Sequence, residues 1–238
     1  MKRTREGGFT LLELLIVISI IAILSIALVF MLNPAETLKK ARDAQRISDL
    51  KTVKTALGIM LTSTSTPSLD GTFGSTATGI CTSTGAGGAP TLSKIAYSSA
   101  SAPTSGITVT PGADAISGAA FSSTSGNTSA TAGKVDGTGW IPVNLKALTG
   151  GTPISSFPVD PTNTTSAVAS INDLVYRYAC QNGSTVSTKP AFIFEIDAQL
   201  ESSAYTSDDD KRSKDGGDYA SIYETGNSLN LLPSSGNF

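Results

Sequence analysis

The chain has 238 residues and a formal net charge of −2, and it contains two cysteines and no histidine. Without a basic surplus the composition indicates no direct binding to nucleic acid, and the lack of histidine removes the commonest general base and metal ligand. We expect a protein that is not an enzyme and has no cofactor, because the sequence also lacks a nucleophile elbow, a phosphate-binding loop and a zinc motif.

A short basic leader, residues 1–8, precedes a long apolar segment. The segment FTLLELLIVISIIAILSIALVFML runs from Phe9 to Leu32, and Glu13 is its one charged residue. A helix of about 24 residues is roughly 36 Å long and can cross a bilayer core of about 30 Å. Positive charge before the span predicts a single pass through the cytoplasmic membrane, with the N-terminus inside the cell and the rest of the chain outside.

Two ordinary kinds of membrane segment fit this region less well. A secretory signal has a shorter apolar core followed by a small-residue cleavage site, whereas the small pair Gly7-Gly8 precedes the core here. A plain membrane anchor fits the length but leaves Glu13 unexplained, because a carboxylate within a membrane helix is costly and is usually functional.

The segment GGFTLLEL, from Gly7 to Leu14, resembles the type III signal of type IV prepilins and pseudopilins. A basic leader, a glycine, an aromatic residue, a glutamate and a long apolar run follow one another in that order. The resemblance implies cleavage after Gly8 by a membrane prepilin peptidase, N-methylation of Phe9 by the same enzyme, and a role for Glu13 in assembly. The partners it implies are the peptidase, the membrane assembly platform, other copies of the chain and related pilins.

Elementary electrostatics also gives Glu13 a role. Cleavage after Gly8 would create a cationic amine on Phe9, one helical turn from Glu13 and on the same face. An unpaired amine or carboxylate is costly in lipid, so pairing relieves both costs. The sequence alone allows this pair within one subunit or between neighbours, and the resemblance implies the pair between neighbours.

The apolar segment is followed by an amphipathic one, and together they predict a rod over residues 9–61. Asn33-Pro34 either kinks a continuous helix or starts a new one, with Asn33 as the cap and Pro34 at the first position. Beyond this point large apolar residues recur at three- and four-residue steps, and we expect this stripe to pack on a head domain. The stripe consists of Ile47, Leu50, Val53, Leu57 and Met60.

Residues 62–133 form an insertion rich in Ser, Thr, Gly and Ala. Such a composition buries too little apolar surface to offset chain entropy unless it docks on something else. We expect an exposed, poorly ordered segment with one short strand at residues 107–109. Cys81 lies in this insertion and Cys180 lies beyond it, and two lone cysteines in an exported chain could form a disulfide.

Residues 134–238 predict a compact β head. The segments around Tyr176–Cys180 and Phe192–Asp197 alternate with period two, which indicates strands with one wet face. Trp140 and the aromatic residues of these strands are candidate core residues. The resulting fold class is α+β, a type IV pilin-like arrangement in which a long N-terminal helix packs on a small antiparallel sheet.

The C-terminal part of the head carries an acidic, glycine-containing loop. Clustered carboxylates can hold Ca²⁺, which takes several oxygen ligands, although this spacing is not that of an EF-hand. Alternatively, the basic residues Lys211, Arg212 and Lys214 neutralise the acids. The candidate ligands are Asp208, Asp209, Asp210, Asp215 and Asp218.

These features predict a structural subunit, a pilin or pseudopilin, that is inserted in the membrane and then assembled into a filament outside the cell. The alternative is a minor or tip pilin, or a membrane-tethered adhesive module with the insertion as its binding part. Glu13 favours a subunit in the body of the filament, because a tip subunit has no neighbour above it to pair with.

Overall fold

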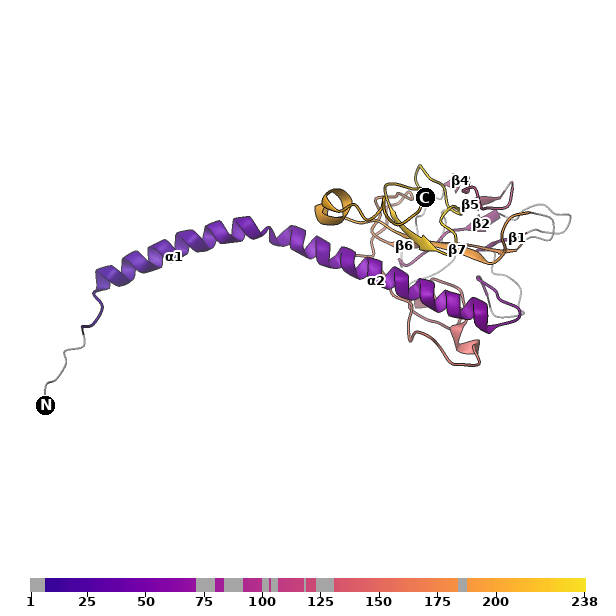
Figure 1. The fold of residues 1–238 in the computed structure, drawn as a ribbon, viewed down its shortest axis with the longest axis horizontal. Coiled ribbons are helices and arrows are strands. Elements are labelled where there is room, and N and C mark those ends of the chain that lie inside the picture. The colour runs from indigo at the N-terminus through magenta and orange to yellow at the C-terminus, as the bar shows by residue number, and fades with distance from the viewer. Residues whose placement is uncertain are drawn as a thin grey trace.

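The computed structural model of the chain shows two successive helices that lead into a head (Figure 1). The helices are α1 (Leu11–Leu32) and α2 (Pro34–Ser63). Part of the predicted leader, residues 1–6, and parts of the predicted insertion lie outside the described residues. The structure describes residues 7–71, 80–83, 92–99, 103, 107–117, 119–122, 131–183 and 188–238.

The two helices meet at Asn33, where the rod changes direction (Figure 1). Asn33 has φ 36° and ψ 73°, a left-handed conformation that ends α1, and asparagine adopts this conformation more readily than most residues. Its side chain also accepts a hydrogen bond from the backbone N–H of Glu36 at 3.4 Å, and Pro34 takes the first position of α2. Of the two alternatives, the structure shows a newly capped helix.

The apolar stripe of α2 packs into the head, as the periodicity predicts. Leu50, Val53, Leu57 and Met60 are fully buried, and Ile47 is partly buried against the same cluster. The helix contacts β7 (Ile193–Ala198) and β8 (Tyr223–Gly226) on one side. The segment that carries Trp140 and the short helix η2 (Leu145–Ala147) belongs to the same core cluster.

The central sheet has five strands. Its order is β1-β6-β7-β8, and β3 also pairs with β6. The pairs are antiparallel, as expected for the head, except β1 with β6. The strand β1 comes from the predicted insertion and runs along β6 in the same direction. The remaining strands of this sheet are β1 (Thr82–Ser83), β3 (Ala96–Tyr97) and β6 (Tyr176–Gly183).

A second, three-stranded sheet is built from the predicted insertion. Its order is β2-β5-β4, with β2 (Leu92–Lys94) parallel and β4 (Thr108–Val109) antiparallel to β5 (Ala120–Ser122). The strand β4 agrees with the short strand expected at residues 107–109. The expectation of an exposed segment is wrong for the described part, because sparse apolar residues there dock on the central sheet. They include Ile95, Tyr97 and Phe121, all at most 1% exposed.

The central strands have no wet face, which corrects the pattern expected from their alternation. All six residues of β7 are buried. One face packs on α2, and the other is covered by a second cluster that includes residues of the smaller sheet and Phe238 at the C-terminus. Charged residues that alternation would place in solvent, Arg177, Glu195 and Asp197, are therefore inside the head, each 0% exposed.

Candidate processing and assembly site

The backbone around the expected cleavage point is open. Gly7 and Gly8 precede α1 in a segment without regular secondary structure, and a side chain at either position would meet no atom within 4 Å. Phe9 is 87% exposed. The Gly8–Phe9 peptide bond is thus accessible to an enzyme that approaches from outside the chain.

Thr10 and Glu13 form a capping box at the start of α1. The Thr10 hydroxyl accepts from the backbone N–H of Glu13 at 3.2 Å, and the Glu13 carboxylate accepts from the backbone N–H of Thr10 at 2.8 Å. The Thr10 hydroxyl also donates to the same carboxylate oxygen, Oε2, at 2.8 Å. These contacts supply partners to amide groups that a helix N-terminus leaves unsatisfied.

The helical relation expected between Phe9 and Glu13 is absent from this structure. Thr10 is the N-cap and α1 begins at Leu11, so Phe9 lies outside the helix. Both bonds from Thr10 fall on Oε2 of Glu13, and Oε1 accepts no hydrogen bond from the described residues. In the uncleaved chain Glu13 therefore caps its own helix and keeps one carboxylate oxygen for another donor.

The surface of α1 is apolar on every side. None of its residues is buried, and its large apolar side chains are between 47% and 86% exposed. The hydroxyl groups of Ser19 and Ser25 donate hydrogen bonds to the backbone carbonyls of Ile16 and Ile21, both at 2.7 Å. Both hydroxyls therefore have a hydrogen-bond partner within the helix. By length and composition, the helical segment that contains α1 is the one among the described residues that could cross a membrane.

The acidic loop is neutralised largely by its own basic residues. Asp209 pairs with Lys211 and, at 2.6 Å, with Lys214, and these bonds lower the pKa of Asp209 to about 2. Asp210 pairs with Arg212 at 3.0 Å.

The other three predicted calcium ligands do not take part in these ion pairs. Asp215 accepts from the backbone N–H groups of Gly217 and Glu224, both at 2.8 Å. Asp218 lines an open cleft, and Asp208 ends the short helical turn η3 (Ala204–Asp208). In the described part of the chain, the carboxylate group with metal-ligand spacing is a different one, formed by residues of β7 and β8.

Cys81 and Cys180 lie together. Cys180 belongs to β6, and Cys81 directly precedes β1, which pairs with β6. Their Sγ atoms are 2.01 Å apart and form a disulfide. The bond links the predicted insertion to the middle of the central sheet.

A buried charge cluster joins α2 to the head, and no local sequence pattern indicates it. Arg46 is fully buried and donates to both carboxylate oxygens of Asp160, at 2.6 and 3.0 Å. It also donates to Asp43 and to Glu201, both at 2.8 Å. Arg42 adds a second two-point contact to Glu201, at 2.7 and 2.8 Å. We refer to these five residues as the rod–head clamp.

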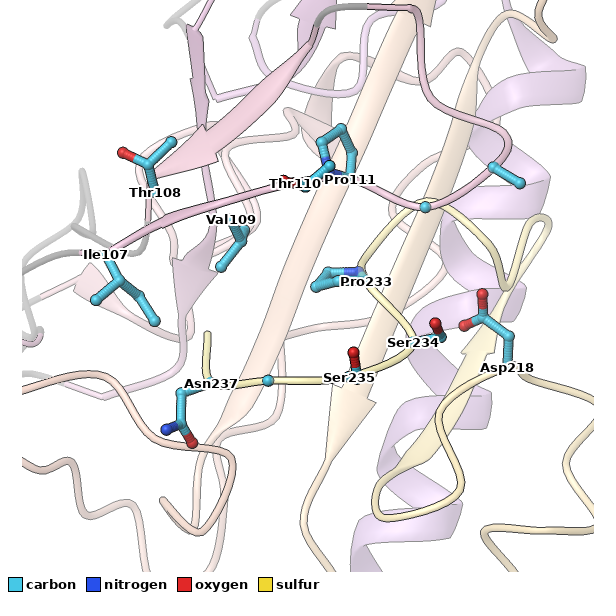
Figure 2. Close-up of a pocket in the computed structure, with 13 residues that line it drawn as sticks. Ile107, Thr108, Val109, Thr110, Pro111, Asp218, Pro233, Ser234, Ser235 and Asn237 are labelled. Carbon is cyan, nitrogen blue, oxygen red and sulfur yellow. The ribbon is translucent and has the colours of Figure 1, made fainter.

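An open cleft of about 620 Å³ lies between β4 and the C-terminal segment (Figure 2). Pro111 and Pro233 face each other across it, with Asp218 beside Ser234 at one end and Asn237 at the other. Asp218 is the one ionisable side chain in this lining, so the cleft offers no pair of titratable groups for acid–base chemistry.

Comparison with protein families gives one match, which includes the capped start of α1. Residues 3–29 match the family model described as the prokaryotic N-terminal methylation motif. The chain thus carries the prepilin-type cleavage and methylation signal, which includes Gly8, Phe9 and Glu13. Curated proteins and solved structures yield no match. The long N-terminal helix and the mixed-sheet head fit an α+β type IV pilin-like fold.

Proposed function

We propose that this chain is the precursor of a type IV pilin or pseudopilin subunit that assembles into a filament outside the cell. One observation carries the proposal: the prepilin-type signal, residues 3–29, includes the expected cleavage point and most of α1, a helix with no buried residue. Exposing such an apolar surface to water is unfavourable, whereas contact with lipid or with the helices of neighbouring subunits is favourable.

Processing would occur at the open segment before α1. The prepilin peptidase would cut after Gly8 and methylate the new amine of Phe9. Before cutting, the basic leader holds the N-terminus in the cytoplasm and the head lies outside. The membrane assembly platform would then receive a subunit anchored through α1 alone.

Assembly would use the charge that α1 retains. The amine of Phe9 exists only after cleavage, and the Glu13 carboxylate is exposed with one oxygen free of hydrogen bonds from the described chain. Pairing the amine of one subunit with Glu13 of its neighbour would neutralise both groups in a low-dielectric environment and set the axial register.

The test is the mass of the mature chain. Membranes from cells that contain an active prepilin peptidase should yield a protein that begins at Phe9 and carries one additional methyl group on its amine. Cells with an inactive peptidase should yield the intact precursor, which serves as the matched control. A mature N-terminus at Met1, or one located after Leu32, would contradict the proposal.

A further inference from the structure

Three carboxylates meet inside the head, on the face of the central sheet that points away from α2. Asp197 on β7 is the cross-strand partner of Glu224 on β8, and Glu195 lies two residues from Asp197, on the same face. Each contributes an oxygen that lies within 4.8 Å of the other two. The three residues are at most 2% exposed, and we refer to them as the carboxylate triad.

Only two of the six carboxylate oxygens of the triad have hydrogen-bond donors in the described part of the chain. Oε2 of Glu195 accepts from the backbone N–H groups of Leu231 and Leu232, at 2.8 and 3.0 Å. Oε2 of Glu224 accepts from the N–H of Tyr219 at 2.9 Å. The other oxygen of each glutamate, and both oxygens of Asp197, have no donor in the described part of the chain. Buried oxygens without partners are strongly unfavourable.

The nearest buried cation offsets only part of this charge. Arg177 is the cross-strand partner of Asp197, but its guanidinium donates to main-chain oxygens of Phe238, Ser170 and Asp173, at 3.0, 2.5 and 3.3 Å. The triad therefore holds more carboxylates than this one guanidinium can balance. A bound cation would offset the excess negative charge.

We propose that the carboxylate triad is an internal site for a divalent cation, with calcium as the ion that fits best. Its donors are all oxygens, which select hard cations, and the 4.8 Å span is about twice a Ca²⁺–oxygen distance of roughly 2.3–2.6 Å. The four oxygens without donors would be the protein ligands, and water would complete the coordination.

The surrounding segments close directly over the triad. A Cβ atom at Gly217 would overlap the Glu224 carboxylate, so the loop before β8 can approach this closely only with a glycine there. Burial and the neighbouring carboxyl groups raise the pKa of Glu195 to about 8 and that of Glu224 to about 9. A bound cation would tie β7, β8, this loop and the C-terminal segment together.

The test uses the full mature chain in detergent, stripped with a chelator and titrated with Ca²⁺ at pH 8 and fixed ionic strength. Calorimetry should find one ion per chain. At a free concentration of 100 times the dissociation constant, the melting temperature should rise by roughly 5–10 °C. Asp197→Asn and Glu224→Gln should each abolish both signals. Asp209→Asn is the matched control, since it neutralises an exposed acid that is paired with lysines, and it should retain both.

Three results would overturn the proposal. The first is a wild-type chain that takes up no calcium. The second is a calcium response that survives in both triad variants. The third is a response lost in Asp209→Asn but kept in the triad variants, which would assign the ion to the exposed acidic loop. If Asp197→Asn fails to fold, Glu195→Gln replaces it, because its amide oxygen can still accept from Leu231 and Leu232.

Discussion

At the scale of single residues, Glu13 combines two tasks that different substitutions can separate. In the precursor its carboxylate completes the capping box with Thr10, a role that depends on an acceptor oxygen and not on charge. The proposed pairing with the amine of a neighbour depends on the charge. A neutral acceptor at this position therefore keeps the first task and removes the second.

We expect Glu13→Gln to leave membrane insertion and cleavage unchanged and to reduce filament yield strongly, because the amide can cap α1 but cannot neutralise an amine. Thr10→Val is the complementary variant, which loses the cap and retains the charge, and it should assemble better than Glu13→Gln. The measurement is the ratio of filament to membrane-bound subunit in sheared cell fractions. A normal yield from Glu13→Gln would contradict the pairing.

The sequence predicts the processing and assembly residues because their signal is local. Gly8, Phe9 and Glu13 lie within six consecutive positions of a matched motif. The rod–head clamp has no such signal, because Arg46 meets Asp160 across 114 positions. Which distant carboxylate faces a given arginine depends on strand register and loop path, and these follow from the whole packed head.

At the scale of elements, the rod–head clamp fixes how α2 lies against the head. Its central member, Arg46, has 0% side-chain exposure, as do its partners Asp43 and Asp160. Asp43 also accepts from the backbone N–H groups of Glu201 and Ser202, so the helix holds the chain that follows β7. Breaking a buried ion network by removing one member leaves uncompensated charge inside the protein.

Arg46→Met should lower the free energy of unfolding by about 3–5 kcal/mol, because Asp43 and Asp160 would lose their buried cation. Arg42→Met is the matched control: its side chain is 35% exposed, so its loss should have a distinctly smaller effect. Denaturant unfolding of the two variants measures the difference. An equal loss of unfolding free energy in the two variants would show that burial of the arginine does not determine how much its ion pairs stabilise the protein.

The clamp also predicts sensitivity to acid. Hydrogen bonds from Arg42 and Arg46 lower the pKa of Glu201 from 4.5 to about 2. The unfolded chain then binds more protons than the folded chain, so this stabilisation is present above pH 4.5 and is lost as the pH falls toward 2. Thermal unfolding between pH 6 and pH 2 should show a steeper loss in wild type than in Glu201→Gln. If the melting temperatures of wild type and Glu201→Gln fell in parallel as the pH decreased, Glu201 would not be the source of the acid sensitivity.

The helices and central strands follow from periodicity, whereas the second sheet does not. The stripe of α2 and the alternation in β6 and β7 are strong signals because many apolar residues repeat at fixed steps. In the predicted insertion, residues such as Ile95 and Phe121 stand singly among Ser and Thr, and they become core only by docking on a sheet formed elsewhere. Core residues that depend on tertiary packing of this kind produce no periodic hydrophobic pattern in the sequence.

At the scale of the whole molecule, the exposed apolar helix α1 and the packed head are separate parts of the chain. The rod formed by α1 extends away from the head (Figure 1) and buries nothing of its own. The head must therefore stay folded without help from α1. Its buried sheet, the clamp and the disulfide between Cys81 and Cys180 all lie beyond α1.

The disulfide should add to this independence, because it closes a long loop. Cys81 and Cys180 are 99 positions apart, and chain-entropy models assign about 4.7 kcal/mol to a closure of roughly 100 residues. A reductant should lower the melting temperature of the exported protein and leave a Cys81→Ser/Cys180→Ser variant unaffected. Peptide mapping without reduction should recover the two cysteines in one linked pair. Two free thiols in protein recovered from outside the cell would refute the bond, and the stability of the head would then depend on its packed sheets and the clamp.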